Sequence, residues 1–159
     1  MKKIKIFFET SAISNLEQPN VPHREADMKA LWELLTDEIY DVVISPPVID
    51  ELRDTSDVKK RDLLFRYLDK IKFDSIELTE EIYTITHTII DSGVVPENKY
   101  FDALHIACAI ATNCDCIVPY NFRHINRIST IKGAQAISIK LGHGNINIIE
   151  ASPLLIKGE

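Results

Sequence analysis

The sequence predicts an α/β fold, a three-layer α/β/α sandwich built around a mainly parallel sheet. Short β-branched and aromatic segments alternate with longer segments whose apolar residues recur at helical spacing. One helical segment, residues 100–111, is apolar almost all round, which is typical of a helix buried against a sheet. The 159 residues suffice for one core, so we expect a single domain over residues 1–159.

The first three elements follow from local patterns. Residues 4–8 are β-branched and aromatic and predict a buried first strand. Residues 15–22 hold two asparagines and two prolines, which indicate a loop. A long helix is expected over residues 23–40. Its predicted core face consists of Met28, Leu31, Trp32, Leu35 and Ile39. The apolar run at 41–45 predicts the second strand.

Two further helices are expected before the middle of the chain. Ser45 is a suitable N-cap for a helix that carries Glu51, because two prolines follow it and fit the first turn. A helix over residues 58–71 begins after Ser56 or Asp57. Its polar face holds Lys59, Lys60, Arg61, Arg66 and Lys70. Such a face is usually solvated, although it is also one of two places where this chain could hold phosphates.

The second half continues the alternation. The expected elements are a minor edge strand at 75–78, a helix from Thr79 to Ser92, the apolar helix 100–111, a strand at 116–120, a helix at 134–141 and a final strand at 146–149. Gly93 is a standard helix stop, and Pro119 suits a strand end because proline lacks a ladder donor. Strands that alternate with helices predict a parallel sheet covered on both faces.

Composition excludes several classes of protein. The net charge of −6 argues against broad, nonspecific binding of nucleic acid. No apolar run approaches the ~20 residues that cross a membrane, and Lys5 and Glu9 interrupt the N-terminal apolar segment, so we expect a cytoplasmic chain. Cys108, Cys114 and Cys116 are odd in number and lack zinc-knuckle spacing, so neither a disulfide framework nor a zinc site is expected.

Four polar side chains stand near the ends of predicted elements: Glu9, Glu51, Asp102 and Asn121. Parallel strands place their carboxyl ends at one edge of the sheet, so we expect these side chains to share a groove. Carboxylates about 4–5 Å apart repel by several kcal/mol at intermediate dielectric unless a proton or a cation lies between them. Oxygen ligands suit Mg²⁺ or Mn²⁺, ions that assist in-line attack on phosphodiesters.

Other polar residues flank this predicted groove. Thr10 and Ser11 follow Glu9, and we expect their hydroxyls to cap the next turn, with contact to a phosphate or a metal-bound water as the alternative. Arg123 and His124 lie beside the groove mouth and are candidate phosphate contacts. His105 follows Asp102 by one turn; a supporting or core histidine is favoured over a general base.

The chain resembles PIN domains, in particular the VapC-type toxins of toxin–antitoxin pairs. The resemblance rests on residues 8–11, 44–52, 101–107 and 120–124, of which Phe101-Asp102-Ala103-Leu104-His105-Ile106-Ala107 is the most specific. It implies a flavodoxin-like sandwich that cleaves RNA with Mg²⁺ or Mn²⁺, a small antitoxin as partner and a homodimer. By the same resemblance, Glu9, Glu51 and Asp102 are metal ligands, and Asn121 stands at the position of a fourth acid.

Two positions depart from the usual pattern of the family. Glu9 replaces an aspartate, which moves the carboxylate by about one C–C bond, roughly 1.5 Å. Asn121 replaces an acid, which lowers the charge of the groove. A catalytically impaired PIN-like module that binds RNA or a protein is therefore the second hypothesis. A nucleotide-binding or phosphotransfer domain ranks last, because no Gly-rich loop follows the first predicted strand.

Overall fold

The computed structural model describes residues 2–119 and 128–155, and a five-stranded parallel sheet lies at its centre. The strands are β1 (Lys5–Phe8), β2 (Asp41–Ile44), β3 (Asp74–Ser75), β4 (Cys116–Val118) and β5 (Asn147–Ile148), in the order β3-β2-β1-β4-β5. The α-helices are α1 (Thr10–Ser14), α2 (Pro22–Thr36), α3 (Pro46–Arg53), α4 (Val58–Asp69), α5 (Glu80–Asp91), α6 (Tyr100–Ala111) and α7 (Ile128–Lys140). Short 3-10 helices cover Asn15–Glu17 and Ser152–Leu155.

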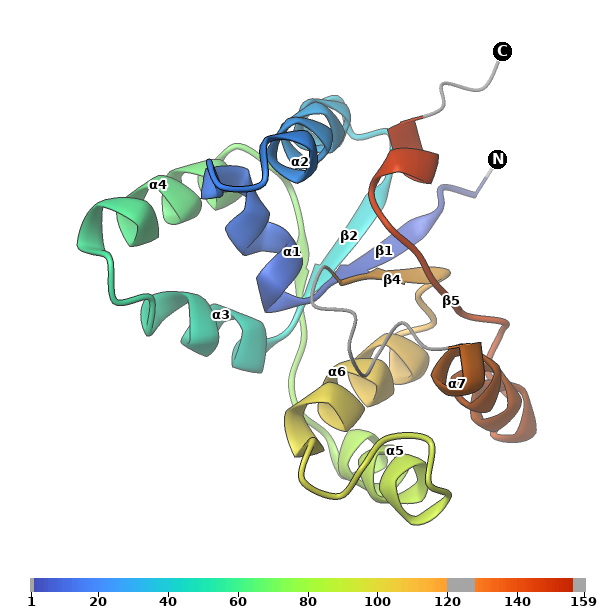
Figure 1. Ribbon diagram of the computed structural model, residues 1–159. Helices are drawn as coiled ribbons and strands as arrows, with labels where there is room; N and C mark the ends of the chain where they lie inside the picture. Colours follow the sequence, from blue (N-terminus) through green and yellow to red (C-terminus); the bar gives the residue numbers. More distant parts are fainter. Residues whose placement is uncertain (1, 120–127, 156–159) are drawn as a thin grey trace.

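Helices cover both faces of the sheet, which confirms the predicted α/β/α sandwich. In Figure 1, α1 to α4 lie on one side of the strands and α5 to α7 on the other. Each strand pairing is parallel, so all strands end at the same edge of the sheet. Among the residues described, no helix combines the length and the apolar character that spanning a bilayer requires.

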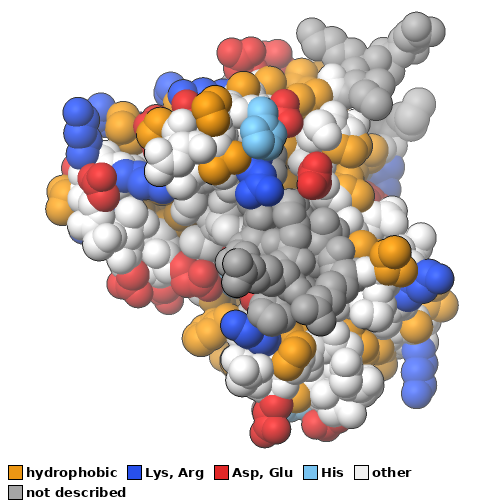
Figure 2. Space-filling view, in the orientation of Figure 1, with side chains coloured by type: hydrophobic (Ala, Val, Ile, Leu, Met, Phe, Trp, Pro, Cys, Tyr) orange, Lys and Arg blue, Asp and Glu red, His pale blue; other side chains and the backbone are white. Residues whose placement is uncertain are grey.

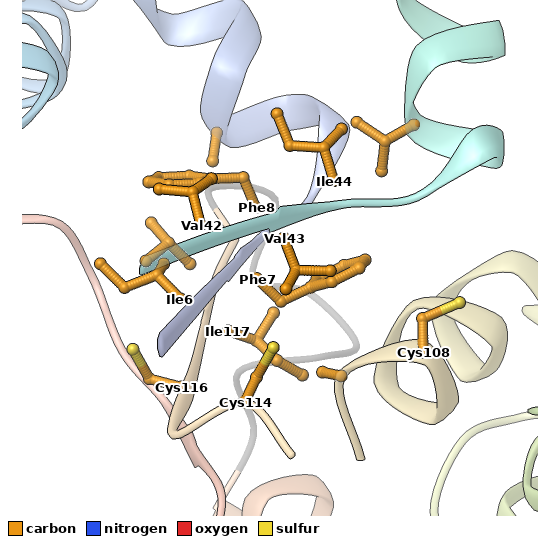
Figure 3. Packing of buried hydrophobic residues seen from close by; sticks show 14 of the residues in the cluster. Ile6, Phe7, Phe8, Val42, Val43, Ile44, Cys108, Cys114, Cys116 and Ile117 are labelled. Carbon is orange, nitrogen blue, oxygen red and sulfur yellow. The ribbon is translucent and has the colours of Figure 1, made fainter. Parts of the chain in front are cut away.

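The central strand β1 is buried on both faces, as its sequence predicts. Phe8 and Val42 point to one side of the sheet, and Phe7 and Val43 point to the other (Figure 3). The Phe8 ring lies 5.6 Å from that of Trp32 on α2, while the Phe7 ring lies 6.0 Å from that of His105 on α6. The alternation of side chains along this strand therefore joins the two helical layers.

Helix α2 ends four residues earlier than predicted. Glu38 adopts a left-handed conformation with φ of 55°, which stops the helix soon after Thr36. Ile39, which was expected on the core face, is consequently 52% exposed. Trp32 is a core residue as predicted, and its indole Nε1 donates a hydrogen bond to the Tyr67 carbonyl at 2.8 Å.

Helix α7 begins at Ile128, six residues before the predicted start at Ala134. Glycine and β-branched residues in its first turns are weak helix formers, which concealed the helix in the sequence. The structure shows why the glycine is suitable: a Cβ on Gly133 would lie 2.6 Å from Val94 Cγ2. Close packing of this helix against the loop after α5 therefore compensates for low propensity.

The remaining elements differ little from the expected ones. Helices α5 and α6 agree with the predictions, and the Thr79 hydroxyl accepts a hydrogen bond from Ile82 N as the expected cap of α5. The edge strand β3 consists of Asp74 and Ser75, so it starts one residue before the predicted range 75–78 and ends at its first residue. The three cysteines are buried and free, as expected.

The basic face of α4 is mostly occupied by local contacts. Lys60 Nζ donates to Gln18 Oε1 at 3.0 Å, Arg61 pairs with Asp62 at 3.7 Å, and Lys70 lies over the Tyr67 ring at 5.1 Å. Figure 2 shows Lys and Arg side chains over α4 together with acidic side chains on the same face. These contacts indicate that the basic face of α4 is an ordinary solvent-exposed face and not a phosphate-binding surface.

Candidate functional site at the carboxyl edge of the sheet

Glu9 follows β1 directly and caps helix α1. Its backbone is extended, with φ of −83° and ψ of 157°, and its Oε2 accepts a hydrogen bond from Ser11 N at 3.0 Å. The Ser11 hydroxyl donates to the same oxygen. The predicted cap by Thr10 or Ser11 is therefore wrong: the longer glutamate side chain folds back and does the capping itself. One carboxylate oxygen of Glu9 is held in this way.

Glu51 reaches the same edge from helix α3. This helix starts one residue after β2, with two prolines in its first turn, and carries Glu51 back over the sheet. Its Oε1 lies 3.1 Å from Nε2 of His105 on α6. The His105 side chain is 1% exposed, whereas that of Glu51 is 38% exposed. A buried imidazole thus contacts a carboxylate that solvent can still reach.

Glu9, Glu51 and His105 form a compact group. Each offers one ligand atom, and these atoms lie within 4.8 Å of one another. Asp102 does not belong to this group; it lies one turn before His105 on α6 and is partly exposed. Its role as a ligand therefore stays a prediction. Asn121, Arg123 and His124 lie outside the described residues.

The two carboxyl groups of the cluster differ in acidity. Burial raises the pKa of Glu9 above its ordinary value, and the negative charge of Glu51 adds to that rise, while Ser11 and His105 oppose it. Burial also acts to raise the pKa of Glu51. The hydrogen bond with His105, the charge of His105 and the Thr10 hydroxyl outweigh burial, so the pKa of Glu51 lies below its ordinary value. Neighbouring acids whose pKa values are pushed apart are typical of functional sites.

The family model described as "PIN domain" matches residues 6–129. The chain belongs to the PIN domain family.

One solved structure similar to this PIN domain is VapBC2 from Rickettsia felis, bound to a DNA fragment from their promoter. The two share 14% sequence identity and superpose with a TM-score of 0.58, over 92% of this chain and 100% of the other. At that identity the likeness shows the fold alone. No curated protein sequence matches this chain.

Among the described residues of this PIN domain, three buried polar atoms have no hydrogen-bond partner, and all three belong to residues at or near the Glu9–Glu51 pair. Within the described residues they are Thr10 Oγ1, Ser45 Oγ and His105 Nδ1. Ser45 occupies the N-cap position of α3, but its hydroxyl makes no cap hydrogen bond, contrary to the prediction. The Thr10 hydroxyl lies close enough to Glu51 to lower the pKa of the Glu51 carboxyl, but its distance and angles do not form a hydrogen bond.

Strand register explains why these groups gather at one edge. Phe7 pairs with Val43, so the chain leaves β1 at Glu9 beside the point where it leaves β2 at Ser45. Buried polar groups are normally satisfied, and a cluster of exceptions indicates a bound water or ion. Two carboxylates with hydroxyls nearby are hard oxygen donors that suit Mg²⁺ or Mn²⁺ and the waters these ions retain. The residues present therefore fit a hydrated divalent cation.

Sequence reasoning undervalued two members of this PIN site. A supporting or core role was favoured for His105 over a general base, and its three-residue spacing from Asp102, which places both on one side of the helix, was not used to place it beside Glu51. Ser45 was assigned only as a cap. The signal that could have identified it is its position after β2, which corresponds to the position of Glu9 after β1.

Proposed function

We propose that this PIN domain is a metal-dependent endoribonuclease, with Glu9 and Glu51 as its central metal ligands. The observation that carries the proposal is the approach of these carboxylates within 4.8 Å, among buried polar atoms that lack partners. Asp102, on the same helix as His105, is the proposed third ligand, and Asn121 is proposed for the position of the fourth acid. Thr10, Ser11, Arg123 and His124 are the proposed contacts to the RNA backbone.

The chain's own residues have separate tasks in this proposal. Ser11 fixes one oxygen of Glu9, and His105 fixes one oxygen of Glu51, so that the remaining oxygens are presented to the cation. A bound Mg²⁺ or Mn²⁺ supplies positive charge that offsets the charge of the phosphodiester under attack. Ser45 and Thr10 offer buried hydroxyls that could bind waters around the cation.

The biological setting is also part of the proposal. The chain is proposed to be the toxin of a toxin–antitoxin pair, with a small antitoxin as partner, a homodimeric state and a cytoplasmic location. The fold that this chain shares with VapBC2 supports the proposed antitoxin partner. The family match supports the nuclease class.

A second candidate function has one observation in its favour. Glu9 Oε2 already accepts two hydrogen bonds from Ser11, so only its other oxygen is available to a cation. A domain with a weakened metal site would act as a module that binds RNA or a protein. Such binding would not change when divalent ions are removed by a chelator.

The decisive experiment measures cleavage of total cellular RNA and Mn²⁺ binding by calorimetry. We expect cleavage with Mg²⁺ or Mn²⁺ and none with EDTA. Glu51→Gln and Asp102→Ala should lose more activity than the about 10- to 100-fold that removal of an outer-shell partner causes. Glu81→Gln is the matched control, because Glu81 also contacts a histidine but lies on α5. Cleavage that survives EDTA or Glu51→Gln contradicts the proposal.

A further inference from the structure

His105 is the member of the Glu9–Glu51–His105 cluster that offers an imidazole nitrogen and not a carboxylate oxygen. Its imidazole is buried, packs 6.0 Å from the Phe7 ring, and contacts Glu51 through Nε2. The separation of 3.1 Å between Nε2 and Glu51 Oε1 is compatible with two arrangements. It fits a hydrogen bond, and it also fits two adjacent ligands of one octahedral ion with bonds of about 2.1 Å, whose donor atoms lie roughly 3.0 Å apart.

The other imidazole nitrogen distinguishes these arrangements. A histidine that binds a metal through Nε2 carries its proton on Nδ1, and that N–H almost always donates to a carboxylate, a carbonyl or a water. Nδ1 of His105 is buried, and within the described chain it has no partner. A proton on Nδ1 would therefore be a buried donor without a partner among the described residues, whereas a proton on Nε2 has an acceptor at hydrogen-bond distance.

We propose that His105 is a positioning residue, protonated on Nε2, that holds Glu51 Oε1 by donating a hydrogen bond and does not bind the metal. The cation part of this inference rests on the proposed function; the hydrogen bond does not. Glu51 then presents its other oxygen to the groove, and the cation meets oxygen donors only. Oxygen donors alone suit Mg²⁺ or Mn²⁺, whereas an imidazole ligand would suit Zn²⁺ or Ni²⁺.

The first test uses nitrogen NMR on the ¹⁵N-histidine-labelled, metal-free chain. We expect the long-range proton–nitrogen pattern of an imidazole whose proton is on Nε2. The His105 signals are assigned with His105→Gln, and His143→Gln serves as the matched control because His143 contacts a glutamate at nearly the same distance. A proton on Nδ1 overturns the inference.

The second test uses pulsed electron paramagnetic resonance of Mn²⁺ bound to the wild-type chain. We expect no coupling to a directly bound imidazole nitrogen, and a strong ¹⁴N coupling overturns the inference. Mn²⁺ affinity should fall about 10- to 100-fold in His105→Leu, which keeps bulk but removes the donor, and His105→Gln, which keeps an N–H donor, should fall less. Equal affinity in wild type and His105→Leu also overturns it.

The two proposals fail in different ways. If the wild-type chain binds no Mn²⁺, the proposed function and the oxygen-only cation site are both wrong. The NMR experiment then still decides whether His105 donates to Glu51, because it needs no metal. The resonance measurement on Mn²⁺ bound to the wild-type chain also remains decisive if the His105 variants do not fold.

Discussion

Two histidine–glutamate pairs lie at opposite ends of the sheet and are used differently. At the carboxyl edge, His105 Nε2 lies 3.1 Å from Glu51; beyond the amino edge, His143 Nε2 lies 3.0 Å from Glu81. The second pair belongs to the amino end because Asn113, which contacts His143 Nδ1 at 2.9 Å, lies just before β4. The pairs have almost equal lengths, so distance alone does not separate a functional contact from a structural one.

The two pairs differ in the burial of the histidine and in the number of its hydrogen-bond partners. Both nitrogens of His143 have partners, and the residue joins α5, the α6–β4 turn and the loop after α7. His105 is almost fully buried and uses one nitrogen only. Another polar side chain at the amino end of the sheet also has a partner, because Asp115 Oδ2 accepts a hydrogen bond from Lys5 N at 2.8 Å. A histidine with hydrogen-bond partners at both nitrogens indicates a structural role. Buried polar atoms without partners beside two carboxylates indicate a site that binds water or an ion.

The largest expected difference is in stability. His105→Ala should lower the free energy of unfolding by about 2–3 kcal/mol, because it empties a buried, packed position. His143→Ala should lower it by about 1 kcal/mol, because the hydrogen bond that it loses to Glu81 involves a side chain that is 59% exposed and can bond to water instead. Urea unfolding measures both values. Equal losses would mean that the two pairs are not distinguished by burial.

A smaller effect concerns the buried thiols, of which Cys114 lies at the amino end. Burial raises the pKa of Cys114 to about 11 and those of Cys108 and Cys116 to about 12, from 9.0. Above pH 9 the unfolded chain releases thiol protons that the folded chain retains, so stability falls as pH rises, by at most about 1.4 kcal/mol per unit for each thiol. Urea unfolding at pH 8, 9 and 10 should show this fall, and Cys114→Ala should reduce its slope.

The smallest effect compares the two acids of the site in metal-free protein. Because the pKa of Glu9 is raised in the folded chain, the stability that protonated Glu9 contributes is lost as pH rises above 4.5. The buried negative charge is then unfavourable, so Glu9→Gln, which removes that charge, should stabilise the fold at pH 7. The lowered pKa of Glu51 contributes stability above 4.5 that disappears as pH falls, so Glu51→Gln should destabilise it. Each change in melting temperature should be at most about 2–4 °C. Shifts of the same sign would contradict the split in acidity.

Local patterns in the sequence predicted most of the fold because they report burial directly. The apolar run at 100–111 became α6 with the expected bounds, and the β-branched segment at 4–8 became the central strand. The failures occurred where packing outweighed propensity. Helix α7 forms across Gly133 because Val94 needs the space, and no pattern within residues 128–140 indicates that contact.

The sequence by itself determined that Glu9 and Glu51 would meet. Parallel strands end at a common edge, so an acid just after β1 and another in the helix after β2 are brought there by connectivity alone. Only the tertiary structure decided which residue of α6 joins them. Asp102 and His105 are three positions apart and share one side of the helix, and the way α6 packs against Phe7 brings His105 within reach of Glu51. That choice depends on contacts between distant segments, which local periodicity does not encode.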